Sequence, residues 1–350
     1  MNIGIVGVPQ VGKTTLFRLL TNLDADAAKR RANIGVAMVP DARIDFLSSI
    51  FAPRKTTYAH INVTDTPGLQ TGHSAELLAA LKGTDALVVV VRAFEAATVP
   101  TAHADGCDPL ADVQAVDAEL VVNDWALLDT RLERLKKGSR NPQSASVVAA
   151  LERVAETLAD GKPLREQALT EEDCEALQGM AFYSDKPLIV VVNTDERQMR
   201  SGDYPGKARL TQWCNEHDAP LLEVCAQLEM EISELNQADR ALFLQDLGIA
   251  ETGLTRLARV AYEKLGLFSF FTVGEDEVKA WTIRKNSTAQ QAAGKIHSDI
   301  ARGFIRADVV SYAAFKEHQG KHLRENGLRR LEGREYVVED GDIIDFRFNV

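Results

Sequence analysis

Eight residues near the N-terminus have the types and the spacing of a phosphate-binding loop. Gly7 to Thr14 reads Gly-Val-Pro-Gln-Val-Gly-Lys-Thr, which fits the pattern G-x-x-x-x-G-K-[ST]. The glycines let backbone N–H groups face phosphate oxygens, and the N-terminus of the following helix favours an anion. A chance match in a turn is the alternative. However, an apolar strand, Ile3 to Val6, precedes the loop, and residues with helical spacing follow it.

This loop predicts a site for a nucleoside triphosphate with Mg²⁺. Lys13 is expected between the β- and γ-phosphates, as a binding and catalytic residue, and the Thr14 hydroxyl is expected to ligate Mg²⁺. The predicted nucleotide contacts in this region are Gly7, Val8, Pro9, Gln10, Val11, Gly12, Lys13, Thr14 and Thr15.

A second short motif, Asp65-Thr66-Pro67-Gly68, follows a predicted strand, Tyr58 to Thr64. The pattern D-x-x-G is common and says little alone, but here it ends a strand downstream of the phosphate loop. Asp65 is therefore predicted to hold Mg²⁺ through water, and the Gly68 N–H is predicted to reach the γ-phosphate.

The segment Asn193-Thr194-Asp195-Glu196 follows another predicted strand, at the place where GTPases have N-K-x-D. In those enzymes the aspartate accepts two hydrogen bonds from guanine. Here Glu196 takes that position and Thr194 takes the lysine position. Because a carboxylate one methylene longer cannot occupy the same spot, guanine specificity is expected to be weakened. For Asn193 the alternative role is to cap a helix.

A further loop after a strand, Cys225-Ala226-Gln227, corresponds in position to the S-A-K loop of GTPases, whose backbone touches the base. Cys225, Ala226 and Gln227 are therefore included in the predicted base site. A core thiol without contact to the nucleotide is the alternative for Cys225.

The elements that must position these loops are strands alternating with helices, which predicts an α/β fold with a parallel sheet. The alternation breaks between residues 112 and 185. Two apolar stripes at helical spacing are separated there by Gly138 to Pro142, which predicts an inserted helical hairpin. Thr170-x-x-Asp173 predicts the capping box of a third helix. We assign residues 1–111 and 186–266 to one nucleotide-binding domain and residues 112–185 to a helical insert.

The tail, residues 267–350, has a different character. It contains 13 basic and 13 acidic residues, so the first 266 residues carry the whole net charge of −11. Predicted strands at 269–273 and 280–283 are followed by a helix from Ser287 through Ile300. Further strands are predicted at 304–310, 336–338 and 343–348. This order is typical of a ubiquitin-like β-grasp domain.

Composition excludes several classes of protein. The net charge of −11 argues against a protein that coats nucleic acid by bulk charge. The longest apolar runs have five residues, far from the ~20 of a membrane helix, and no secretory signal is visible. The four cysteines lack metal-binding spacing. We expect a cytoplasmic protein with reduced thiols.

Together these residues resemble the YchF/Obg-like ATPase subfamily of Obg-related P-loop NTPases, in the TRAFAC class. The likeness extends over nearly the whole chain. The matching motifs are G-x-P-x-V-G-K-[ST]-T-L-F at 7–17, V-P-D-x-R at 39–43, N-x-x-E at 193–196, A-W-T-I at 280–283, Q-A-A-G-x-I-H at 291–297, R-G-F-I-R-A at 302–307 and F-R-F-N-V at the end.

The resemblance implies a P-loop G domain, a coiled-coil helical insert and a C-terminal TGS domain. It also implies Mg²⁺ as cofactor, slow hydrolysis of ATP in preference to GTP, and association with ribosomes through the TGS and helical domains. We expect a monomer. A nucleotide-gated binding module with negligible hydrolysis and a GTP-preferring GTPase are the alternatives.

The chain departs from the family at several points. Gln10 replaces an asparagine, which puts potassium dependence in doubt, and the regions equivalent to switches I and II are shortened. Leu69 stands where Ras-like enzymes have the glutamine that orients water. The resemblance suggests a histidine in the loop after Phe94-Glu95, here His103, as the water-activating residue; an exposed histidine without a role is the alternative. Gln70 and His73 are weaker candidates.

Overall fold

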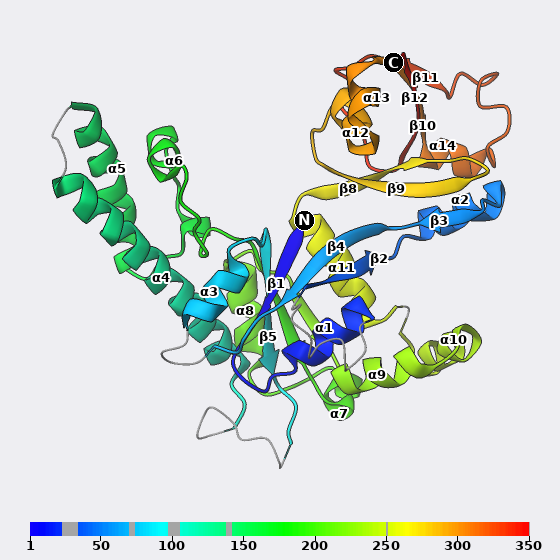
Figure 1. The fold of residues 1–350 in the computed structure, drawn as a ribbon. Coiled ribbons are helices and arrows are strands. Elements are labelled where there is room, and N and C mark those ends of the chain that lie inside the picture. The colour runs from blue at the N-terminus through cyan, green and yellow to red at the C-terminus, as the bar shows by residue number, and fades with distance from the viewer. Residues whose placement is uncertain (23–33, 70–73, 97–105, 138–141, 250, 350) are drawn as a thin grey trace. The chain divides into compact units, whose positions relative to one another are not determined.

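The computed structural model describes residues 1–22, 34–69, 74–96, 106–137, 142–249 and 251–349. Figure 1 shows the order of helices and strands along the chain. The chain forms two compact units. The first comprises Met1–Gly35 and Asn62–Arg256, and the second comprises Val36–Ile61 and Leu257–Val350. Residues 36–61, which the sequence analysis placed in the nucleotide-binding domain, thus group with the C-terminal residues.

The first unit is built on the predicted parallel sheet. Its strand order is β2-β4-β1-β5-β6-β7. Strand β1 (Asn2–Val6) lies between β4 (Ala59–Asp65) and β5 (Ala86–Arg92), and β6 (Leu188–Asn193) continues the parallel pairing to β7 (Leu221–Val224). Every residue of β5 and β6 is buried, as expected for a sheet covered on both faces. The carboxyl ends of β1, β4, β6 and β7 carry the motifs singled out above.

Helices alternate with these strands. They are α1 (Lys13–Thr21), α3 (Ser74–Leu81), α7 (Glu196–Ser201), α8 (Lys207–Glu216), α9 (Ala226–Glu234) and α10 (Gln237–Asp246). Helix α11 (Gly253–Lys264) begins in the first unit, and its residues from Leu257 onward belong to the second. Strand β2 (Ile34–Val39) occupies one edge of the sheet.

The predicted helical insert is present. Helices α4 (Pro109–Lys137) and α5 (Pro142–Ala159) lie side by side as a hairpin (Figure 1), followed by the short η1 (Leu164–Glu166) and by α6 (Glu171–Leu177). Leu128 and Leu151 belong to a core that the insert forms by itself. The predicted capping box of α6 is present, with Thr170 and Asp173 bonded reciprocally.

The second unit contains the predicted β-grasp fold. Its sheet has the order β11-β10-β12-β8-β9-β3. The strands are β3 (Lys55–Thr57), β8 (Leu267–Thr272), β9 (Glu277–Arg284), β10 (Phe304–Ser311), β11 (Arg330–Glu332) and β12 (Asp342–Phe348), and the helices are α2 (Ala42–Phe51), α12 (Ala289–Ile296), α13 (Ser298–Arg302) and α14 (Tyr312–Glu317). Strand β3 pairs parallel with β9, so a segment from the N-terminal part of the chain adds an edge strand to this sheet.

Two sequence expectations in this unit were wrong. The helix predicted from Ser287 through Ile300 is interrupted, because His297 is extended (φ −161°) and its ring caps α13 by accepting the Asp299 N–H. The strand predicted at 336–338 is absent, since Val337 makes only an isolated bridge to Thr288. Strand β11 pairs with β10 in its place.

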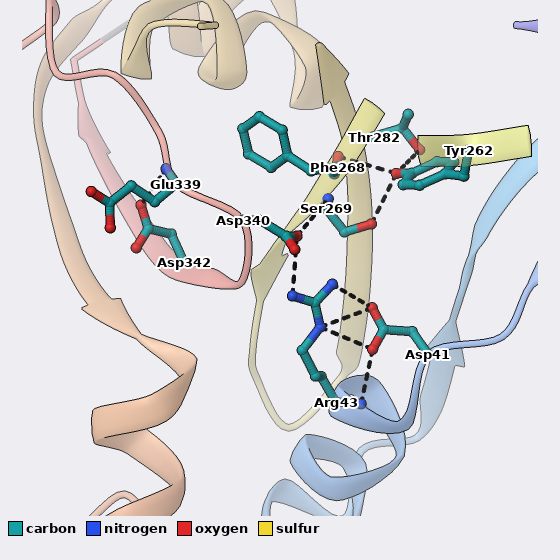
Figure 2. Close-up of polar contacts among 9 residues, drawn as sticks. All are labelled: Asp41, Arg43, Tyr262, Phe268, Ser269, Thr282, Glu339, Asp340 and Asp342. Atoms are coloured by element: carbon teal, nitrogen blue, oxygen red, sulfur yellow. Dashed lines mark hydrogen bonds and ion pairs between the residues drawn. The ribbon is translucent and has the colours of Figure 1, made fainter. Parts of the chain in front are cut away.

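The V-P-D-x-R motif forms a polar cluster within the second unit (Figure 2). Asp41 caps α2 and binds the Arg43 guanidinium through both carboxylate oxygens. Arg43 also lies 3.0 Å from Asp340, and its guanidinium lies 5.1 Å from the centroid of the Phe271 ring. Asp340 in turn accepts the Ser269 N–H. The motif therefore ties α2 to strand β8 and to the segment before β12.

Candidate nucleotide-binding site

The phosphate loop joins β1 to α1 and holds Lys13 largely inside the protein. The Lys13 side chain is 7% exposed, and its Nζ donates a hydrogen bond to the Val8 carbonyl at 2.8 Å. Burial lowers the pKa of Lys13 to about 8, and the nearby Asp65 charge only partly opposes this shift. An ammonium group kept in a dry site without a full countercharge favours an anionic ligand.

One buried amide joins the loop to the two downstream motifs. Asn193 donates from Nδ2 to the Val11 carbonyl at 3.0 Å, and its Oδ1 accepts the Ala226 N–H at 3.1 Å. Gly12 has φ +98°, and a Cβ there would lie 2.4 Å from Asn193 Nδ2, so no other residue fits without displacing this amide. The helix-cap role considered for Asn193 falls to Asp195, which accepts the Gln198 N–H at the start of α7.

Thr14 and Asp65 meet at the start of α1. The Thr14 hydroxyl donates to Asp65 Oδ2 at 2.8 Å, while Asp65 Oδ1 is buried without a hydrogen-bond partner. Burial raises the pKa of Asp65, and the hydrogen bond from Thr14 and the charge of Lys13 counter this only in part. A hydroxyl beside a carboxylate with an unsatisfied oxygen fits Mg²⁺, a hard cation that prefers oxygen ligands and retains water.

The D-x-x-G segment is anchored to the same edge of the sheet. The Thr66 hydroxyl donates to the Ile5 carbonyl at 2.6 Å, and the Leu69 N–H donates to the Gly7 carbonyl at 3.0 Å. A Cβ on Gly68 would lie 3.2 Å from Pro9 Cα, so the Gly68 backbone is close to the phosphate loop. The segment predicted to contact the γ-phosphate thus lies against the loop predicted to cradle it.

The residues predicted to contact the base lie at the ends of β6 and β7. Thr194 is buried and its N–H donates to the Val224 carbonyl. Glu196 is 55% exposed and forms an ion pair with Arg200 at 2.6 Å. The N-x-x-E carboxylate therefore already has a partner one helical turn away, which fixes its direction along α7.

In the Cys225 loop, the backbone carries the contact to the rest of the site. The Cys225 thiol is buried, and burial raises its pKa, so it is a poor nucleophile or ligand. Its neighbour Ala226 supplies the N–H that binds Asn193, and Gln227 bonds Glu231 on the surface of α9. The side chain of Cys225 thus matches the core-thiol alternative.

Some features of the site could not be foreseen and others lie outside the described residues. Gln10 adopts the left-handed conformation (φ +64°), which is strained for a side chain other than glycine, asparagine or aspartate. Gln198 donates to the Ala93 carbonyl at the end of β5, a contact hinted at only by the pattern Asp-x-x-Gln. Three candidates for activating water, Gln70, His73 and His103, lie outside the described residues.

The described part of the chain contains neither a cluster of metal-binding side chains nor a membrane-spanning helix. Residues 1–22, 34–69, 74–96, 106–137, 142–249 and 251–349 contain no group of three or more histidine, cysteine, aspartate or glutamate side chains able to hold a metal. Within the same ranges, no helix has the length and apolar character needed to cross a bilayer.

Comparison with known proteins agrees with this geometry. Residues 2–124 match the family described as 50S ribosome-binding GTPase, and residues 267–349 match YchF-GTPase_C, described as a protein of unknown function (DUF933). The chain is 36% identical to the ribosome-binding ATPase YchF of Bacillus subtilis over 365 residues, which cover 99% of both chains. It is 34% identical over 362 residues to the protein of the same name from Escherichia coli O157:H7, again covering 99% of both.

A solved structure extends the likeness to three dimensions. The YchF GTPase of Schizosaccharomyces pombe has 28% sequence identity to this chain and a TM-score of 0.89, covering 99% of this chain and 97% of that one. A GTP-binding protein of Pyrococcus horikoshii, at 18% identity and a TM-score of 0.60, shares the fold. With a full-length match above 30% identity, a P-loop at the end of β1 and a β-grasp domain at the C-terminus, the chain belongs to the YchF family of P-loop NTP hydrolases.

Proposed function

We propose that this chain is a Mg²⁺-dependent ATPase that associates with ribosomes and acts as a switch in translation. The observation that carries the proposal is the convergence of Lys13, the Thr14–Asp65 pair and Asn193 at the phosphate loop. The bacterial relatives, which match over their whole length, are named ribosome-binding ATPases. Their names support the same partner for this chain.

In this proposal each residue has a defined task. Lys13 binds the β- and γ-phosphates, where its charge also stabilises the transition state. Thr14 and Asp65 would hold Mg²⁺, which when bound neutralises charge on the phosphates. The backbone N–H groups of the loop and of Gly68 position the triphosphate. Asn193 keeps the phosphate loop and the base loops together through its two hydrogen bonds.

The proposal includes a preference for ATP over GTP. Its support is Glu196, whose longer side chain replaces the aspartate that reads guanine and is turned toward Arg200. The test is to measure the affinities for ATP, GTP and ADP side by side on the full chain. A tenfold preference for GTP would instead favour the GTPase alternative.

We further propose that intrinsic turnover is slow, on the order of 10⁻⁴ to 10⁻² per second, as in unassisted Ras-like enzymes. Leu69 cannot orient water because its side chain is apolar and packs against the core, and its N–H is bound to the Gly7 carbonyl. Single-turnover hydrolysis with and without Mg²⁺ separates slow catalysis from the alternative, a nucleotide-gated binding module.

The same assay tests the water-activating residue. His103→Ala is compared with His73→Ala and Gln70→Ala, and a drop in rate for His103→Ala alone assigns the role to that histidine. In that case activity should also fall below about pH 6.5, because the neutral imidazole is the form that accepts a proton. A wild-type rate in His103→Ala would show that water is positioned by the backbone or by a partner.

For the ribosome contact we propose local basic groups in the β-grasp domain. Arg284, the last residue of β9, and Lys285, which follows it, are exposed. Arg329 and Arg330 are weaker candidates, because they form ion pairs with Asp308 and Glu332 within the domain. Substituting Arg284 and Lys285 by glutamine should weaken co-sedimentation with ribosomes. The substitution should also make ribosome binding less sensitive to salt. The slope of log affinity against log salt concentration should fall by roughly one for each lost phosphate contact.

A further inference from the structure

The second unit contains a cavity that the nucleotide site does not use. It has a volume of about 490 Å³, within the range of small-molecule sites, and every residue that lines it belongs to the second unit. It extends from the ends of β8 and β12 to helix α14 and the chain after it, with Thr272, Val310, Phe315, Leu323 and Ile343 among its lining residues.

The apolar wall of this cavity is already formed. The Phe51 and Phe315 rings are stacked, with centroids 5.7 Å apart and planes 24° apart. Gly320, at φ +72°, brings its backbone so close to the Phe315 ring that a Cβ would lie 2.7 Å from a ring carbon. The aromatic faces are therefore fixed before any ligand enters, so little order has to be imposed on binding.

One end of the cavity is cationic. Asp308 lines it and is only 3% exposed, and three guanidinium groups surround its carboxylate. Arg329 Nε lies 3.0 Å from Oδ1, while Arg347 and Arg324 lie 3.6 Å and 3.9 Å from Oδ2. Asp345 lines the same cavity opposite Asp308, so two carboxylates stand against three guanidinium groups, with one positive charge in excess. The result is a pre-positioned site for an anion.

The strand register shows how charged side chains are arranged across the two strands beside the cavity. Arg306 on β10 lies directly opposite Arg347 on β12, and Asp308 lies opposite Asp345. Residues two apart on a strand face the same side, so Arg306 shares the face of Asp308. Like charges directly opposite across a ladder are destabilising. Asp308 and Asp345 form such a pair at the cavity, and the guanidinium groups of Arg329 and Arg347 offset their repulsion.

We propose that this cavity is a binding site for an amphipathic anion. An aromatic or branched aliphatic body would occupy the space beside Phe51 and Phe315. A carboxylate, phosphate or sulfonate group would bind the arginines at the Asp308 end. The site is separate from the phosphate loop, so its ligand and ATP bind without competing for residues.

The test uses the fluorescent sulfonate 1-anilinonaphthalene-8-sulfonate and its neutral relative N-phenyl-1-naphthylamine. Both are titrated into the full chain without nucleotide, and saturating Mg²⁺ and ATP are then added to the complex. Trp281, one of three tryptophans, bonds Thr272 at the cavity wall, so energy transfer from it reports a nearby probe. We expect one site for the sulfonate and a transfer signal that Trp281→Phe removes. Displacement of the sulfonate by ATP would overturn the proposal.

Variants separate the head group from the body. Arg329 lines the cavity, and Arg347 contacts the lining carboxylate of Asp308. Arg329→Gln with Arg347→Gln should weaken the sulfonate about tenfold and leave the neutral probe unchanged, the effect of losing charge-assisted contacts. The matched control, Arg284→Gln with Lys285→Gln, removes two exposed charges outside the cavity and should change neither. Val273→Trp, at the cavity wall, should weaken both probes. Equal binding of the sulfonate to wild type and to the Arg329/Arg347 variant would overturn the assignment.

Discussion

Two polar clusters in this molecule each combine a basic side chain with aspartate, but the pKa of the basic group is lowered in one and raised in the other. At the phosphate loop, burial lowers the pKa of Lys13 to about 8 and raises the pKa of Asp65, whose Oδ1 has no hydrogen-bond partner. Around Arg43, burial is outweighed by hydrogen bonds and charges from Asp41 and Asp340, which raise the pKa of the guanidinium. Within the second unit, the protein itself satisfies the Arg43 cluster.

The difference separates a structural cluster from a site prepared for a ligand. Groups satisfied by the protein stabilise the fold, whereas buried charges left without full compensation mark places where a ligand supplies the missing interactions. Substitutions at the phosphate loop and at the Arg43 cluster should therefore have different effects on ligand binding and on stability.

The largest effect is expected at Lys13. Lys13→Ala removes the cation facing the β- and γ-phosphates and should weaken ATP binding by about 3 kcal/mol or more, since hydrogen bonds to charged groups contribute roughly 1.5–3 kcal/mol each. Isothermal titration with Mg²⁺ and ATP measures this. Arg43→Ala should bind ATP like wild type. Unchanged affinity in Lys13→Ala would contradict the site assignment.

The second prediction concerns pH. Because the folded-state pKa of Lys13, about 8, lies below the ordinary value of 10.5, the unfolded chain binds more protons between these values. The free energy of unfolding should therefore rise with pH in this window, by roughly 3 kcal/mol. Urea denaturation at pH 8 and pH 10.5, with Lys13→Met as reference, isolates the effect from other titrating groups. Saturating Mg²⁺ and ATP should suppress the rise, because a phosphate beside Lys13 raises its pKa again.

The third prediction concerns the base. Glu196→Asp with Thr194→Lys should shift the preference toward GTP by about 1–3 kcal/mol, the usual contribution of a bidentate base contact. The measurement is the ratio of the affinities for ATP and GTP. The control is Glu196→Asp alone, which shows how much of the shift toward GTP comes from shortening the carboxylate. A double variant with the wild-type preference would argue against Glu196 as a base-contacting residue.

The fourth prediction tests the satisfied cluster. Arg43→Ala should destabilise the fold by about 1–2 kcal/mol, because it leaves Asp41 and Asp340 without their cation and removes the contact with Phe271. The matched control is Arg54→Ala, which breaks the highly exposed pair with Asp276 and should cost less than about 0.5 kcal/mol. Chemical denaturation compares the two, and equal effects would show that the Arg43 cluster is not special.

The smallest effect is expected at Gln10. Its left-handed backbone is strained, so Gln10→Gly should raise stability by about 0.5–1 kcal/mol. Gln10→Asn should give part of this gain, since asparagine tolerates that conformation better. Thermal unfolding of the nucleotide-free chain measures both. A loss of stability in Gln10→Gly would mean that the glutamine side chain makes a compensating contact.

The sequence predicted the parts of this structure that depend on contiguous patterns. The phosphate loop is a continuous motif between a strand and a helix, and the strands that carry Asp65 and Asn193 are continuous apolar runs. Their carboxyl ends meet at one edge of the sheet, so the site could be placed without knowing distances. The direction of Glu196 depends instead on Arg200, and sequence spacing alone left that pairing open.

Other features depend on contacts distant in sequence. Strand β3 reads Lys-Thr-Thr and has no apolar alternation, so only its pairing with β9 identifies it as a strand. The break at His297 was missed because Ile296 and Ile300 continue the helical spacing across it. The Asp308 cluster joins arginines from separate segments, and no sequence pattern links Arg329 to Asp308.

The pairing of β3 with β9 has a consequence for protein synthesis. Thr57 bonds Glu277, 220 positions later in the chain. At roughly 5–20 residues per second, a translating ribosome needs on the order of 10 to 40 seconds to cover that interval. Until then α2 and β3 lack their partners, including the aromatic contacts of Phe46 with Tyr312 and of Phe51 with Phe315. Helix α2 and strand β3 therefore complete their packing only after residues 277–315 have been synthesised.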